Sequence, residues 1–144
     1  MKKIFHLFMF ALLFIAVACE QSLENGEITL QESTTVGDWT VSAYIDDNII
    51  FGPFTISTLP TSDNKSIIIK DNDEFWKFQT KAELNNSKDE FSCLSSINEI
   101  GTLGTKINIL NGNFLDADSI NFSIQFEDDE TPYGYTYNIK GHRK

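Results

Sequence analysis

Hydrophobic and polar residues alternate one by one along most of the chain beyond residue 37. This period of two is typical of β-strands that bury one face. The clearest example is the run of Ile120, Phe122, Ile124 and Phe126, which polar residues separate. No segment in this region has the 3.6-residue period of an amphipathic helix, so the pattern predicts an all-β domain. Eight strands are expected, at residues 39–45, 50–58, 66–70, 75–84, 90–95, 106–115, 120–126 and 133–139.

Two positions interrupt the alternation. Pro53 removes a backbone donor from the second expected strand, so pairing should begin after it or accommodate it at a bulge. Asn111-Gly112 is a common hairpin turn, but a glycine at such a position can also form a bulge that bends one continuous strand. We favour the bulge; the alternative is a hairpin that reverses the chain at this point.

The short connections between expected strands favour an up-and-down antiparallel β-barrel of eight strands. Closure of the barrel removes the exposed edges that an open sheet of this size would carry. A barrel of eight strands is wide enough either to fill with side chains or to hold one small ligand. A β-sandwich is the alternative fold.

The first residues have the composition of a secretory signal peptide. Lys2 and Lys3 precede an apolar segment at residues 7–17, which is shorter than the roughly 20 residues of a membrane-spanning helix. This interpretation divides the chain into three parts: a signal peptide at 1–18, a polar tether at 19–35 and a β-barrel domain at 36–144.

Ala16-Val17-Ala18-Cys19 resembles the lipobox of bacterial lipoproteins. The resemblance implies that Cys19 becomes the lipid-bearing first residue of a protein in the cell envelope, with the outer membrane of a Gram-negative bacterium as the expected location. The alternative is an ordinary signal peptide followed by a chance cysteine. If Cys19 is lipidated, Cys93 has no partner for an internal disulfide.

The charge balance excludes some classes of function. The chain has 11 basic and 21 acidic residues, a net charge of −10, and the loss of Lys2 and Lys3 would make it more negative. Such a balance argues against nucleic-acid binding and against electrostatic adhesion to anionic lipid headgroups. Attachment to a membrane would therefore depend on the acyl chains of Cys19.

Two sequence resemblances point to a family. Gly37-Asp38-Trp39 resembles the G-x-W signature of lipocalins, which implies that Trp39 closes the barrel floor beneath a basic side chain, Lys140 or Arg143. Residues 66–84, 118–128 and 135–144 resemble a family of small bacterial lipoproteins named "lipid-binding putative hydrolase". This second resemblance covers most of residues 36–144. It implies a lipid-like ligand and suggests hydrolysis, but it supplies no catalytic motif.

Aromatic residues are frequent in the expected strands, and they have two possible roles. They could line a cup that holds a hydrophobic or amphipathic ligand. They could instead fill the barrel completely, because a domain of this size needs most of its large apolar residues for its own core. The candidate lining residues are Phe54, Trp76, Phe78, Phe91, Phe122, Phe126, Tyr135 and Tyr137.

Acidic residues concentrate in every second connection between the strands. Alternate connections of a meander emerge at the same end, which by resemblance to lipocalins is the open mouth. We therefore predict an acidic rim that favours cationic or zwitterionic ligands, or a basic partner protein. A hairpin at Asn111-Gly112 would move the last four acids to the other end. The rim residues are Asp46, Asp47, Asp71, Asp73, Glu74, Glu99, Glu127, Asp128, Asp129 and Glu130.

Neither metal binding nor catalysis has a strong sequence signal. Aspartates and glutamates are ligands that calcium prefers, but none of the clusters has the EF-hand spacing, and ordinary turn chemistry explains them equally. His142 is the one histidine beyond residue 18, and no Gly-x-Ser-x-Gly motif is present. Cys93 follows Phe91 on an alternating strand, which predicts a buried thiol. We expect no cofactor and no metal.

The sequence therefore predicts a lipid-anchored envelope protein that binds a small hydrophobic or amphipathic ligand in a barrel cup. The first alternative is a filled barrel whose acidic loops contact another protein. A hydrolase, as the family name suggests, is the third.

Overall fold

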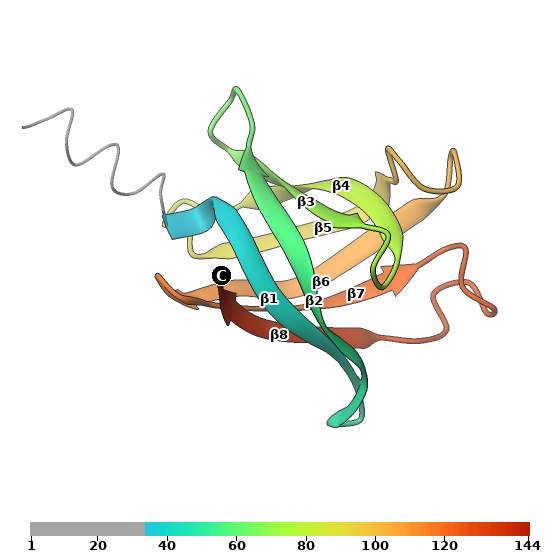
Figure 1. The fold of residues 1–144 in the computed structure, drawn as a ribbon. Coiled ribbons are helices and arrows are strands. Elements are labelled where there is room, and N and C mark those ends of the chain that lie inside the picture. The colour runs from blue at the N-terminus through green and yellow to red at the C-terminus, as the bar shows by residue number, and fades with distance from the viewer. Residues whose placement is uncertain (1–33) are drawn as a thin grey trace, which may run out of the picture. The chain divides into compact units, whose positions relative to one another are not determined.

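The computed structural model describes residues 34–144, which belong to one compact unit. Figure 1 shows that the chain forms a barrel of antiparallel strands. The eight strands in this part of the chain are β1 (Gly37–Ile45), β2 (Asn48–Pro60), β3 (Ser66–Asn72), β4 (Lys77–Leu84), β5 (Glu90–Ile97), β6 (Lys106–Asp116), β7 (Ser119–Phe126) and β8 (Tyr137–Arg143).

The sheet closes on itself, because each strand pairs with the next and β8 pairs with β1. Trp39 lies opposite Arg143, and Tyr44 lies opposite Asn138. The predicted up-and-down barrel is confirmed, and the β-sandwich is wrong. The signal peptide proposed for residues 1–18 and the tether up to residue 33 lie outside the described residues.

Both interruptions of the pattern are bulges. In β2, Val41 pairs with Phe54 and Ala43 pairs with Phe51, so Gly52 and Pro53 form the extra backbone opposite one residue of β1. β2 therefore begins earlier than expected and continues through its proline.

β6 likewise continues through Asn111 and Gly112. Leu110 pairs with Ser123 and Asn113 pairs with Asn121, which leaves two residues opposite one. Asn111 adopts a φ of 51°, in the left-handed region that asparagine tolerates better than most residues. The favoured bulge is confirmed. The β7–β8 connection therefore lies at the same end of the barrel as the β1–β2 connection, as expected.

Two further differences from the expected strand boundaries move aromatic residues out of the strands. β4 begins at Lys77, so Phe75 and Trp76 belong to the preceding turn. The last strand was expected at 133–139 but lies at Tyr137–Arg143, because Pro132 and the left-handed Tyr133 (φ 56°) keep the preceding residues in a connection. The alternation of tyrosines at 133, 135 and 137 is therefore not a strand pattern over its full length.

The barrel interior is a packed hydrophobic core. Inward-facing residues of all eight strands contribute to it, and the inward-facing isoleucines of β3, β6 and β7 are almost completely buried. One end of the barrel carries the β1–β2, β3–β4, β5–β6 and β7–β8 connections, and we call this end the mouth. The opposite end, where residues 34–36 lead into β1, is called the base.

Candidate functional site

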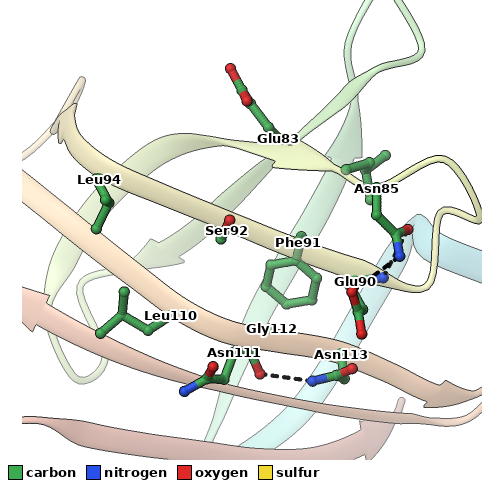
Figure 2. A pocket seen from close by; sticks show the side chains of 11 residues that line it. Glu83, Asn85, Glu90, Phe91, Ser92, Leu94, Leu110, Asn111, Gly112 and Asn113 are labelled. Carbon is green, nitrogen blue, oxygen red and sulfur yellow. Dashed lines mark hydrogen bonds between the residues drawn. The ribbon is translucent and has the colours of Figure 1, made fainter.

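The outer wall of the barrel carries a groove across β4, β5 and β6 (Figure 2). Its volume is about 550 Å³, and the small side chain of Ser92 lies among the larger Glu83, Leu94 and Leu110. Leu94 is 73% exposed, which makes it the most exposed of the leucines that line this groove. The groove lies on the outer face and was not anticipated from the sequence.

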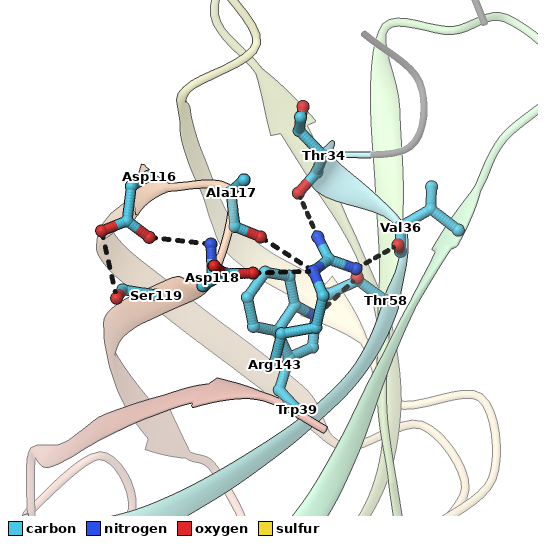
Figure 3. A network of polar contacts seen from close by, with 9 residues as sticks. All are labelled: Thr34, Val36, Trp39, Thr58, Asp116, Ala117, Asp118, Ser119 and Arg143. Carbon is cyan, nitrogen blue, oxygen red and sulfur yellow. Dashed lines mark hydrogen bonds and ion pairs between the residues drawn. The ribbon is translucent and has the colours of Figure 1, made fainter. Parts of the chain in front are cut away.

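The base of the barrel is closed by Trp39. The indole is fully buried and donates a hydrogen bond to the Thr58 hydroxyl at 2.9 Å. Its ring packs against Phe114, with 5.6 Å between ring centroids. The guanidinium carbon of Arg143 lies 4.3 Å from the centroid of the Trp39 ring, a distance that permits a cation–π interaction (Figure 3).

Arg143 also ties three segments together at the base. Its guanidinium donates to the backbone carbonyls of Thr34 at 2.7 Å, Val36 at 2.9 Å and Ala117 at 2.8 Å (Figure 3). The residues ahead of β1 are thus fixed to the β6–β7 turn. Thr35 is buried, and its carbonyl accepts a hydrogen bond from Thr58.

Lys140 does not cover Trp39, so that expectation is wrong. It pairs with Ser42 on the outward face of β8, and its ammonium lies 5.3 Å from the Tyr44 ring centroid and 3.6 Å from Asp47. Successive side chains of a strand point to opposite faces, so Arg143, three residues after Lys140, points to the inner face and reaches the barrel floor.

The mouth is occupied by a group of aromatic rings that we call the mouth cluster. Phe75 lies at its centre, with its ring centroid 5.3–6.5 Å from those of five other rings. Trp76 stacks on Phe126 with parallel planes and a centroid distance of 4.3 Å. The members are Phe51, Phe54, Phe75, Trp76, Phe126, Tyr135 and Tyr137.

The mouth cluster is buried on the side that faces the barrel core and exposed on the side that faces solvent. Phe54, Phe126 and Tyr137 are buried, Phe75 and Trp76 are half-buried, and Phe51 and Tyr135 are 41% and 46% exposed. The rings therefore form the upper layer of the core and also present an aromatic surface to solvent. The sequence analysis did not include Phe51 and Phe75 among the lining residues. Phe51 directly precedes the bulge of β2, and Phe75 lies in a turn rich in acidic residues.

The other predicted lining residues lie deeper in the core. Phe78 packs on Phe126 at 5.6 Å, and Phe91 packs on Phe122 at 5.7 Å and on Phe114 at 5.0 Å. These deeper rings contact one another rather than line an open cup. Only the partly exposed rings of the mouth cluster face solvent. The packing thus corresponds to the filled interior that the sequence left as one of two possibilities.

Asp71 does not belong to the acidic rim. It is completely buried, because it follows Ile67 and Ile69 at the inward positions of β3. One carboxylate oxygen accepts the backbone N–H of Glu74 at 3.0 Å, and the other accepts those of Phe75 at 2.9 Å and Trp76 at 2.8 Å. These charge-assisted hydrogen bonds satisfy the buried carboxylate and fix the turn that carries Phe75 and Trp76.

The remaining rim residues lie at the mouth, and several of them are bound to the protein itself. Asp128 accepts the indole N–H of Trp76 at 3.3 Å, and Asp129 accepts the hydroxyl of Tyr137 at 2.8 Å. Burial, together with the Asp129 carboxylate, raises the pKa of Tyr137. Aromatic rings and carboxylates are therefore in direct contact at this end.

Further acids of the mouth bind backbone or side-chain donors of neighbouring strands. Glu74 accepts the N–H of Thr55 at 3.1 Å, and Glu127 accepts that of Lys106 at 2.7 Å. Glu99 accepts from the Gln79 amide. Asp46 and Asp47 form the two-residue β1–β2 turn, whereas Asp73 and Glu130 are exposed in their connections.

The residues considered for catalysis lie away from the mouth cluster. His142 is exposed on β8, opposite Thr40 of β1 and Ser119 of β7. Cys93 lies on β5, and burial raises the pKa of its thiol, which disfavours the nucleophilic thiolate.

Residues 34–144 contain neither a metal-binding cluster nor a membrane-spanning helix. In this range, no group of three or more His, Cys, Asp and Glu side chains is arranged to hold a metal ion. The same residues include no helix that is both long and apolar enough to span a membrane.

Comparison with known proteins adds a family to this geometry. Residues 23–144 match the model of the family described as "Lipid-binding putative hydrolase". The chain belongs to this family. Its matched region contains the whole barrel, the closed base and the mouth cluster. No curated protein matches the chain. The family description names lipid binding, and the closed barrel is compatible with ligand binding.

Proposed function

We propose that the protein is a lipid-anchored component of the cell envelope that binds a small amphipathic ligand at the mouth cluster. The observation that carries this proposal is the aromatic surface at one end of the barrel, where Phe51 and Tyr135 are 41% and 46% exposed. Half-exposed aromatic rings offer an apolar surface whose coverage by a ligand is favourable.

The apolar part of the ligand would lie on Phe51, Phe75 and Trp76. Phe75 and Trp76 belong to a turn rather than to a strand, and so they can shift without breaking the strand ladder. At the base, the ring of Trp39 is fully buried beneath Arg143 and presents no surface to a ligand. As in the lipocalins, which the Trp39 floor resembles, the ligand would approach from the open end.

The acidic residues of the mouth favour a ligand with a positive or zwitterionic headgroup. Asp128 and Asp129 directly contact Trp76 and Tyr137, so a headgroup beside these rings would meet carboxylates. The negative field would repel fatty-acid anions. Aromatic faces beside carboxylates also attract quaternary ammonium groups through cation–π interaction.

Isothermal titration calorimetry on the chain from Glu20 to Lys144 tests this proposal. The probes are three monomeric dodecyl amphiphiles that differ in headgroup: phosphocholine, trimethylammonium and carboxylate. We expect the first two to bind, and the carboxylate to bind at least tenfold more weakly. Trp76→Ala should weaken binding about tenfold, whereas Leu94→Ala on the outer wall should leave it unchanged. Equal affinity for all three headgroups would contradict the acidic selectivity.

A protein partner is the second candidate, and a specific observation favours it. Ile49 and Ile50 of β2 are 63% and 45% exposed beside Phe51, so the apolar surface extends beyond the barrel opening. A basic protein surface could cover this patch and contact the acids around it. The absence of binding for every amphiphile would favour this alternative over the small ligand.

A further inference from the structure

The wall of the barrel is weakest between β4 and β5. In the register of these two strands, only Glu83 with Ser92 and Leu84 with Phe91 are paired, and both pairs lie near the base. By contrast, β3 and β4 pair at seven consecutive positions, from Ser66 with Glu83 to Asn72 with Lys77. The β3–β4 hairpin is thus firmly built, but its contact with β5 lacks a continuous ladder.

In the half of this seam that faces the mouth, isolated contacts replace the ladder. One is a backbone bond, in which the N–H of Glu99 donates to the carbonyl of Gln79 at 2.9 Å, and the others involve side chains. The hydroxyl of Ser96 donates to the carbonyl of Lys81 at 3.0 Å, and that of Thr80 donates to the carbonyl of Ile97 at 3.3 Å. Single hydrogen bonds of this kind contribute little stability each, so they can break one at a time. The left-handed Ser95 (φ 53°) marks the irregularity in β5.

Asn98 holds the end of β4 that is nearest to the mouth. Its side chain is buried, with 1% exposure. Its amide nitrogen donates to the carbonyl of Lys77 at 3.0 Å, and its amide oxygen accepts the N–H of Gln79 at 3.1 Å. The same oxygen accepts the N–H groups of Ile100 and Gly101 in the β5–β6 connection. One side chain therefore latches β4 to the β5–β6 connection beside it.

The wall is also open enough at the seam for an inward-facing residue to be reached from outside. Cys93 pairs with the buried Ile109 and shares its inward parity, yet it lines an outer pocket of about 510 Å³ together with Lys81 and Leu94. The Cys93 thiol lies 3.9 Å from the carbonyl of Ile107, and the Thr80 hydroxyl of β4 is near enough to lower the pKa of this thiol against the rise that burial causes. Thr80 and Cys93 are thus neighbours across the gap.

We propose that the β3–β4 hairpin is a flap that swings away from β5 to admit a ligand, with Asn98 as its latch. The hairpin carries at its tip the turn with Phe75 and Trp76, which Asp71 fixes to β3. Release of Asn98 lets β4 separate from β5 and lifts both rings from the core. The pairs near the base, Glu83 with Ser92 and Leu84 with Phe91, stay closed and act as the hinge.

Amide hydrogen exchange with mass spectrometry tests the flap without any ligand. The readout is segment 73–76, in which the N–H groups of Glu74, Phe75 and Trp76 are bound by Asp71 and not by Asn98. We expect Asn98→Ala to raise exchange in this segment about tenfold while segment 37–45 of β1 changes less than twofold. Asn108→Ala is the matched control, because its amide bridges β5, β6 and β7 instead. Unchanged exchange in 73–76, or an equal rise in both segments, would overturn the proposal.

A disulfide across the seam tests whether the flap must open to admit the ligand. This part of the proposal rests on the proposed function. Thr80→Cys places a second thiol beside the native Cys93, and thiol counting reports whether the bond has formed. We expect the oxidised protein to take up dodecylphosphocholine at least tenfold more slowly than the reduced form of the same variant. Equal uptake rates would show that the seam does not open for the ligand. If the unmodified protein binds no amphiphile, the proposed function fails, whereas hydrogen exchange still decides whether the flap exists.

Discussion

Asp71 shows how one buried charge can organise an aromatic surface. Its carboxylate accepts three backbone N–H groups from the turn that presents Phe75 and Trp76. The sequence placed Asp71 among the acids of the rim, although Ile67 and Ile69 share its parity and indicate an inward position. The alternation of Ile67, Ile69 and Asp71 along β3 was the signal in the sequence that Asp71 points inward. What the sequence could not provide is the set of N–H partners that makes a buried carboxylate tolerable.

Replacement of Asp71 should destabilise the fold and disorder the turn. Asp71→Ala leaves three N–H groups without their charged acceptor, which we expect to lower the free energy of unfolding by about 3 kcal/mol. Urea denaturation measures the change. Asp73→Ala, at an exposed position of the same turn, should change stability by less than about 0.5 kcal/mol. Similar losses for both variants would argue against a special role for Asp71.

Arg143 and Lys140 allow a second comparison at the residue scale. Arg143→Ala removes the cation–π contact with Trp39 and three hydrogen bonds to backbone carbonyls. We expect a loss of about 2–4 kcal/mol, together with a red shift of tryptophan emission as water reaches the floor. Lys140→Ala should cost less than about 0.5 kcal/mol, because its ion pair with Asp47 is exposed. A larger loss for Lys140→Ala than for Arg143→Ala would contradict this account of the floor.

At the scale of elements, period-two alternation was sufficient to predict the strand number and the barrel. The short connections indicated that consecutive strands are neighbours in the sheet. Closure was favoured because an open sheet of eight strands would leave two edges exposed. Strand boundaries failed where aromatic residues continue the alternation into a turn, as at Phe75 and Tyr135. The seam between β4 and β5 left no mark in the sequence, because serine and threonine in a strand do not reveal whether their hydroxyls replace a ladder.

The β1–β2 turn offers a stabilising prediction for one element. Asp46 and Asp47 both adopt positive φ, 47° and 63°, in a two-residue connection between Ile45 and Asn48. Asn-Gly suits this backbone better and removes two adjacent negative charges. The double change Asp46→Asn with Asp47→Gly should raise stability by about 0.5–1 kcal/mol in urea denaturation. Asp46→Asn alone should gain less, and a net loss for the pair would contradict the turn assignment.

At the scale of the whole molecule, the barrel has a sealed base and an aromatic mouth at opposite ends. The described chain begins at the base, where Thr34 is bound to Arg143. The sequence anticipated the aromatic content, and its acidic rim stays a prediction. It could not decide between a cup and a filled interior, because both use the same alternating residues, and only the contacts of the rings distinguish them.

The proposed lipid anchor belongs to this scale as well. Cells that express the full chain and are fed an alkyne analogue of palmitate should incorporate the label, because the proposed lipobox would direct acylation to Cys19. Cys19→Ala should remove the label and release the protein from the membrane fraction, whereas Cys93→Ala should retain both. Labelling that survives Cys19→Ala would show that the anchor lies elsewhere or is not a lipid on this residue.

The most direct test of ligand binding at the mouth is native mass spectrometry. The chain from Glu20 to Lys144 is produced in the bacterial envelope and purified without detergent, beside a Phe75→Ala/Trp76→Ala variant whose fold is checked by circular dichroism. Our account predicts a one-to-one adduct that gentle activation removes from the native protein, and whose mass identifies an amphipathic molecule. The variant should carry less than about a tenth of it. A bare protein mass in every preparation, or an adduct of equal abundance on the variant, would contradict binding at the mouth cluster.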